Sequence, residues 1–174
     1  MIKRLRTKII KYALYFLLLF FAYIIQATPG LLDYYGAKAM LVIPVCVCIA
    51  VCEGELAGGI FGFLAGLFCD SSASTVFGFN AFVLTAFCAG IGLAAIYLFR
   101  RSSINVMLVG FGTIFARAFG EYFFSYMLYG YENIRGFFYW ELMPEAVFTS
   151  LFILPYYFLI KYIHTRLEPE VPTE

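Results

Sequence analysis

Charge is scarce in this sequence. Of its 174 residues, 13% are Asp, Glu, Lys or Arg, about half the share found in an ordinary soluble domain. Hydrophobic residues make up 63% of the chain and aromatic residues 21%. So few charges cannot cover the surface of a soluble globule of this length. The composition therefore excludes a soluble enzyme, a disordered chain and a nucleic-acid-binding protein, and it predicts an integral membrane protein.

Motifs of catalysis and metal binding are also missing from the sequence. It has no G-x-S-x-G, no H-E-x-x-H and no P-loop, so we predict neither enzymatic activity nor a cofactor. Cys48 and Cys52 share a helix face, but no histidine completes a metal site with them. The single histidine, His164, stands alone near the C-terminus. We interpret the cysteines as small apolar packing residues; they are Cys46, Cys48, Cys52, Cys69 and Cys88.

Long apolar stretches fill the chain instead. A helix needs about 20 apolar residues to cross the hydrocarbon core of a bilayer. The sequence predicts an all-α membrane protein, with six transmembrane helices in one bundle and a single domain over residues 1–174. The predicted spans are approximately 11–27, 37–52, 54–69, 77–99, 104–127 and 143–163.

The basic residues predict how the spans are oriented. Cytoplasmic segments of membrane proteins are enriched in Lys and Arg. Six spans place three basic clusters on one side of the membrane, so both termini are expected in the cytoplasm. A single span over 39–69 would put the middle cluster outside and would overshoot the bilayer. The clusters are Lys3, Arg4, Arg6, Lys8 and Lys11; Arg100 and Arg101; and Lys161, His164 and Arg166.

A few charged residues fall inside or at the ends of the predicted spans, where a charge is costly. Arg117 and Glu121 are spaced i, i+4 in the fifth span, so their side chains can meet on one helix face as a buried ion pair. We favour a structural lock over a proton or substrate path for this pair. Glu145 follows Pro144 at the start of the sixth span, where a carboxylate near the interface suits a helix N-terminus.

Glycines recur every four residues in the third span, at Gly54, Gly58, Gly62 and Gly66, and the series ends at Asp70. Such a stripe lets another helix approach closely. It can serve a partner protein or packing within the bundle, and both uses remain open. Weaker versions occur in the fourth and fifth spans, at Ala86, Gly90 and Ala94 and at Gly112, Ala116 and Gly120.

The residues after the stripe predict a turn and the start of the next helix. Asp70 is expected at the outer end of the third span, as a turn residue followed by serines that can cap a helix. Gly78 then permits close backbone approach, and Asn80 can form a hydrogen bond to another helix.

The run G-G-I-F-G-F-L-A-G-L-F-C-D over 58–70, followed by F-G-F-N-A over 77–81, resembles the G-x-x-x-G-L-x-x-D…G-x-N-A signature of the rod shape-determining protein MreD family. The chain length, the basic N-terminal segment and the multi-pass layout are also similar to that family. The resemblance implies a non-enzymatic scaffold in the bacterial cytoplasmic membrane that supports side-wall peptidoglycan synthesis. It further implies MreC as the main partner, in a complex with MreB, RodA and an elongation-specific penicillin-binding protein.

A second family is similar in architecture, namely the substrate-binding membrane component of energy-coupling-factor vitamin transporters. In that interpretation Arg117, Glu121 and the aromatic outer segment 126–140 would line a ligand pocket. The same aromatic residues are typical of an interfacial belt, which we consider the better interpretation.

Overall fold

The computed structural model describes residues 2–28, 30, 33–34, 37–72, 77–97, 103–122 and 143–167. Four helical segments in this part of the chain are long and apolar enough to cross a membrane: Arg6–Ala27, Phe79–Tyr97, Ser103–Gly120 and Pro144–Leu167. A shorter apolar helix covers Val42–Glu53. The chain is therefore a helical membrane protein, while the count of six spans and the cytoplasmic location of its termini stay predictions.

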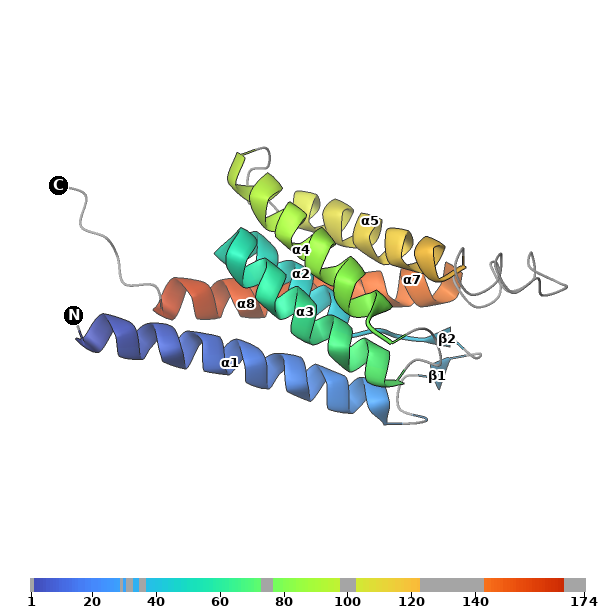
Figure 1. The fold of residues 1–174 in the computed structure, drawn as a ribbon, viewed down its shortest axis with the longest axis horizontal. Helices are drawn as coiled ribbons and strands as arrows, with labels where there is room; N and C mark the ends of the chain where they lie inside the picture. The colour runs from blue at the N-terminus through green and yellow to red at the C-terminus, as the bar shows by residue number, and fades with distance from the viewer. Residues whose placement is uncertain are drawn as a thin grey trace, which may run out of the picture.

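The helices form one bundle (Figure 1). The first residues of α1 and the last residues of α8 lie at the same end of it, and the short strands β1 and β2 lie at the other (Figure 1). In chain order the elements are α1 (Ile2–Ala27), β1 (Asp33–Tyr34), β2 (Ala37–Lys38), α2 (Val42–Glu53), α3 (Glu55–Ser72), α4 (Phe79–Tyr97), α5 (Ser103–Tyr122), α7 (Met143–Leu151) and α8 (Ile153–Leu167).

The second predicted span, 37–52, begins too early. Residues 37–38 form β2, which pairs antiparallel with β1 in the register Asp33 to Lys38 and Tyr34 to Ala37. Helix α2 starts only at Val42 and has 12 residues. The prediction of an all-α chain therefore needs this small correction: a two-stranded hairpin precedes α2.

The predicted break between the second and third spans is confirmed. Helix α2 ends at Glu53, Gly54 alone separates the two helices, and α3 begins at Glu55. Gly54 has a φ of +92°, in the left-handed region that favours glycine, and its N–H donates to the Ala50 carbonyl at 3.0 Å. Its own carbonyl accepts from Gly58 N at 2.9 Å, so one residue ends α2 and opens α3.

The sixth predicted span is not one continuous helix, because α7 ends at Leu151 and α8 begins at Ile153. Pro155 has no N–H to donate to the carbonyl four residues earlier, which is that of Leu151. Around the break, Phe152 N donates to Thr149 O at 3.2 Å and Tyr156 N donates to Phe152 O at 3.3 Å. The helix then continues to Leu167, beyond the predicted end at 163.

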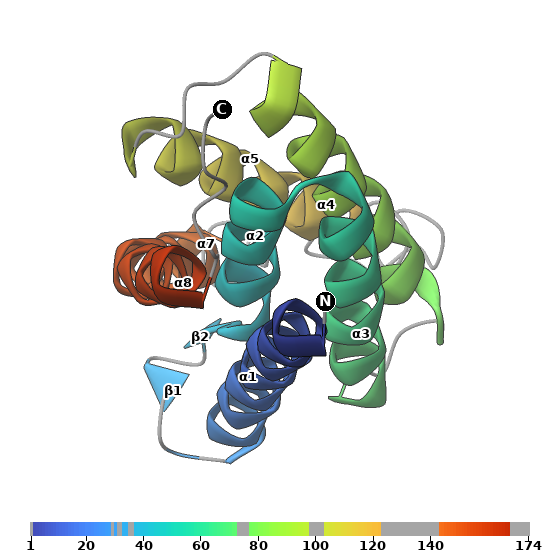
Figure 2. The same ribbon diagram turned by 90° about the vertical axis from the view of Figure 1, so that its left-hand side faces the viewer.

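Helix α2 is the centre of the bundle. All of its residues from Val42 to Cys52 are buried, and it contacts α1, α3, α4, α5 and α8 (Figure 2). The cysteines Cys46, Cys48, Cys52, Cys69 and Cys88 are all buried, as expected for packing residues, and Cys46 and Cys88 bring their sulfur atoms to 3.5 Å of each other. The outer helices cover α2 and present their remaining apolar faces outward.

Candidate functional site

The glycine stripe of α3 lies against α4. A Cβ added at Gly62 would be 2.6 Å from the Leu84 carbonyl oxygen, and one added at Gly66 would be 2.5 Å from Ala81 N. Real Cβ atoms do not approach other atoms so closely. The backbones of α3 and α4 can therefore be in contact only because glycine has no side chain at these positions. The stripe thus brings α3 and α4 together.

The other glycines of the stripe also face neighbours inside the bundle. A Cβ at Gly58 would lie 2.7 Å from the Ala50 side chain of α2 and 2.7 Å from the Cys88 carbonyl of α4. Gly54 faces Gly92 of α4, because a Cβ added at Gly92 would be 2.6 Å from the Gly54 carbonyl oxygen. The stripe is therefore covered by α2 and α4, and a partner helix could reach it only by displacing them.

Asp70 ends the stripe and holds the start of α4. Its Oδ2 accepts hydrogen bonds from the backbone N–H groups of Gly78 and Ala81, and its Oδ1 accepts one from Asn80 N, each at 3.0 Å. The first N–H groups of a helix have no partners within the helix. Here the buried carboxylate of Asp70 from α3 accepts their hydrogen bonds. Its negative charge also suits the positive end of the α4 dipole.

Gly78 is placed for this cap by its backbone. Its φ of +94° lies in the left-handed region, which turns its N–H toward Asp70. The structure thus joins the predicted residues Gly66, Asp70, Gly78 and Asn80 in one α3–α4 junction.

Arg117 of α5 is fully enclosed, at 1% exposure. Its Nε donates to Asn80 Oδ1 of α4 at 3.0 Å, and its Nη1 pairs with Glu145 Oε1 of α7 at 3.3 Å. Hydrogen-bonded carboxylate and amide oxygens reduce the cost of burying the guanidinium. Because Asn80 N is bound to Asp70, a continuous polar chain joins α3, α4, α5 and α7.

The predicted ion pair of Arg117 and Glu121 stays a prediction. Both residues belong to α5, but the side chain of Glu121 lies outside the described part of the structure. Glu145 does lie in the first turn of α7, as the sequence indicates, and its pairing with Arg117 was not expected. The aromatic segment 126–140 of the transporter alternative lies wholly outside the described residues.

At the opposite end of the bundle, Glu53 is the centre of a second polar cluster. Its carboxylate accepts from Lys11 Nζ at 2.7 Å and from Tyr15 Oη at 2.8 Å, and it lies 2.7 Å from His164 Nδ1. The expectation that His164 stands alone is therefore wrong. The partner is 111 residues away in sequence and belongs to α2, so spacing along the chain could not reveal it. The cluster ties α1, α2 and α8 together.

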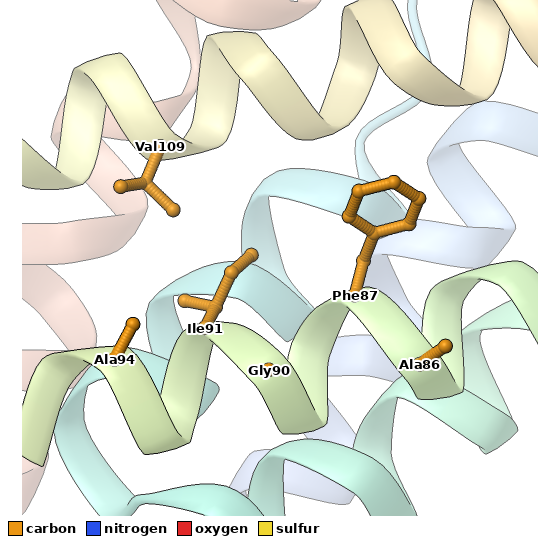
Figure 3. Close-up of a pocket in the computed structure, with 6 residues that line it drawn as sticks. All are labelled: Ala86, Phe87, Gly90, Ile91, Ala94 and Val109. Atoms are coloured by element: carbon orange, nitrogen blue, oxygen red, sulfur yellow. The ribbon is translucent and has the colours of Figure 1, made fainter.

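An apolar groove of about 300 Å³ lies between α4 and α5. Figure 3 shows Phe87 and Ile91 pointing from α4 toward α5, and Val109 pointing back from α5. The small residues Ala86, Gly90 and Ala94 form its floor along α4 (Figure 3). An added Cβ at Gly90 would meet nothing within 4 Å, so this weaker stripe is open where the α3 stripe is covered.

Comparison with protein families gives a match over these elements. A family model described as rod shape-determining protein MreD matches residues 6–163, which include the α3 stripe, Asp70, Arg117 and the α4–α5 groove. A search of curated proteins found no match, and a search of solved structures found none.

Proposed function

Because the chain belongs to the family of rod shape-determining protein MreD, we propose that it is a non-enzymatic scaffold of the bacterial cell-elongation complex in the cytoplasmic membrane. In this role it supports side-wall peptidoglycan synthesis by holding partner proteins together through helix–helix contacts. MreC is the first partner through its single transmembrane helix, and MreB, RodA and an elongation-specific penicillin-binding protein belong to the same assembly.

The groove between α4 and α5 is the observation that favours helix–helix contact. Between helices in lipid there is no hydrophobic driving force, so association depends on close packing, and small residues allow it. The α3 stripe is already used inside the bundle, whereas Ala86, Gly90 and Ala94 line an open face. A helix with bulky apolar side chains can therefore place them on this floor, with Phe87 and Ile91 beside them.

Filling the groove tests the proposal. Gly90→Leu places a large side chain on the floor of the groove and is expected to weaken co-purification with MreC several-fold, since the partner helix can no longer approach. The fold is expected to be unaffected, because an added Cβ at Gly90 meets open space. Thermal unfolding of the purified variant checks this second expectation.

Gly112→Leu is the matched control. Gly112 of α5 also has open space around an added Cβ, but it does not line the groove. This variant should retain MreC. Equal retention of MreC by both variants would refute contact through the groove, and failure of the wild-type chain to co-purify with MreC in the membrane would refute the scaffold function itself.

A further inference from the structure

The end of the bundle where α1 begins and α8 ends carries exposed positive charge. Arg6 and Lys8 lie in the first two turns of α1, and Lys161 and Arg166 lie in the last two turns of α8; all four side chains are exposed. The two helices contact each other, and this end faces the viewer in Figure 2. We call these four residues the basic rim.

The basic rim has no ion-pair partner among the carboxylates that the structure describes. No salt bridge within the described part of the chain includes a basic-rim residue. Glu53 lies between α1 and α8, but its two oxygens are already taken by Lys11, Tyr15 and His164. A surface with several exposed cations that form no ion pair with a described carboxylate attracts an anionic partner.

The two cations of α8 form cation–π contacts with aromatic rings. Lys161 Nζ lies 5.6 Å from the centre of the Tyr157 ring, and the Arg166 guanidinium lies 5.4 Å from that of Tyr162. Tyr162 is exposed, as is typical of aromatic side chains at the boundary between headgroups and hydrocarbon. The basic rim is therefore expected at the level of the lipid headgroups.

Large exposed apolar side chains lie close to the cations in the sequence of both helices. Ile9 and Ile10 follow Lys8 in α1 and are 66% and 44% exposed, while Phe158 and Leu159 precede Lys161 in α8 and are 59% and 43% exposed. A soluble acidic protein matches the cations but not these apolar surfaces. An anionic phospholipid matches both, because its phosphate is negative and its acyl chains are apolar.

We propose that the basic rim binds anionic phospholipids. The headgroup phosphate pairs with Arg6 and Lys8 on α1 and with Lys161 and Arg166 on α8, and the acyl chains follow the exposed apolar faces of the two helices. Lipid bound in this way adds to the connection between α1 and α8 that Glu53 makes inside the bundle. The interaction is separate from contact with MreC and does not depend on it.

Competition between two lipids tests the proposal. The purified full-length chain is mixed with equal amounts of phosphatidylglycerol and phosphatidylcholine, and native mass spectrometry gives the ratio of the two bound lipids. A basic residue near a membrane surface contributes about 1 kcal/mol of attraction to anionic lipid, which corresponds to a factor of about five in binding. The wild-type chain should prefer phosphatidylglycerol, and Arg6→Gln/Lys8→Gln and Lys161→Gln/Arg166→Gln should each lower the preference at least about fivefold.

Two controls separate a defined surface from total charge. Arg6→Lys/Lys8→Arg keeps both charges and should keep the preference. Arg100→Gln/Arg101→Gln removes two charges elsewhere in the chain and should also keep it. Unchanged melting temperatures in phosphatidylcholine alone show that the glutamine variants are folded, since all four rim side chains are exposed.

Four results would overturn the proposal. The first is equal binding of the two lipids by the wild-type chain. The second is an equal loss of preference in Arg100→Gln/Arg101→Gln, because the preference would then follow net charge. Displacement of phosphatidylglycerol by inorganic phosphate at constant ionic strength would point to a free anion as the ligand. Displacement by a polyglutamate peptide would point to an acidic protein as the partner.

Discussion

Gly66→Ala tests the contact between the backbones of α3 and α4. The change adds one methyl group to the face of α3 that is covered by α4. At this position the added Cβ would lie 2.5 Å from Ala81 N and 2.6 Å from Asn80 O. Both are backbone atoms, so no side chain can rotate away to make room. The two helices must separate or bend.

The size of the effect follows from these distances. Carbon atoms pack best at about 3.5–4.0 Å from other heavy atoms, so α3 and α4 must separate by roughly 1 Å. Overpacking of this kind costs about 1–3 kcal/mol. The separation also stretches the 3.0 Å bond from Ala81 N to Asp70, and a hydrogen bond to a charged group contributes about 1.5–3 kcal/mol. Alanine favours a helix over glycine by about 1 kcal/mol. The free energy of unfolding should therefore fall by about 2–4 kcal/mol.

Thermal unfolding of the purified chain in detergent, followed by circular dichroism, measures this loss. For a chain of this size, about 1 kcal/mol shifts the melting temperature by roughly 2–4 °C, so the expected decrease is roughly 5–15 °C. Gly90→Ala is the matched control, since its added Cβ meets nothing within 4 Å and its melting temperature should stay the same or rise. A Gly66→Ala variant that melts at or above the control would refute the close contact.

Three further predictions concern the polar residues. Asp70→Asn keeps the side-chain size but removes the charge that caps α4, so the melting temperature should fall, and Asp70→Ala should lower it more. Arg117→Ala should destabilise the chain more than Arg117→Ala/Glu145→Ala, because the single change leaves the Glu145 carboxylate without its partner. A double-mutant cycle of the two residues should give a coupling energy of about 0.5–3 kcal/mol. The same cycle with Glu121→Ala measures the predicted i, i+4 pair, and zero coupling would exclude it. Glu53→Gln should lower stability by about 3–5 kcal/mol in thermal unfolding, because it leaves a buried lysine without a counter-charge; an unchanged melting temperature would show that the cluster is not stabilising.

Local patterns along the chain predicted the features that depend on neighbours in sequence. The four-residue spacing of the glycines indicated a smooth helix face, and the structure places that face against α4. The distribution of the basic clusters and the length of residues 39–69, too great for a single span, indicated a break there, which the structure confirms. The run from Asp70 to Asn80 predicted a turn and a helix start, and the hydrogen bonds of Asp70 supply its geometry.

Contacts between distant parts of the chain could not be predicted in the same way. Arg117 meets Glu145, 28 residues away, and His164 meets Glu53, 111 residues away. Spacing of three or four residues reports only which side chains share a helix face. The partners of a buried charge depend instead on how helices are arranged around each other. For this reason the sequence identified Arg117 and Glu145 as charged residues at depth but not their pairing, and it did not identify the buried cluster around Glu53.

The burial of α2 constrains how the protein is inserted into the membrane. A helix of 12 residues is about 18 Å long, well short of the roughly 30 Å of hydrocarbon that a spanning helix must cross. Alone in lipid, α2 would leave polar backbone groups at its ends without water or partners. We therefore expect the translocation machinery to release α2 together with α3, as a helical hairpin closed at Gly54, rather than as a separate span. Biogenesis of this protein would then depend on a two-helix unit in which one helix, α2, is enclosed by the other helices once the bundle is complete.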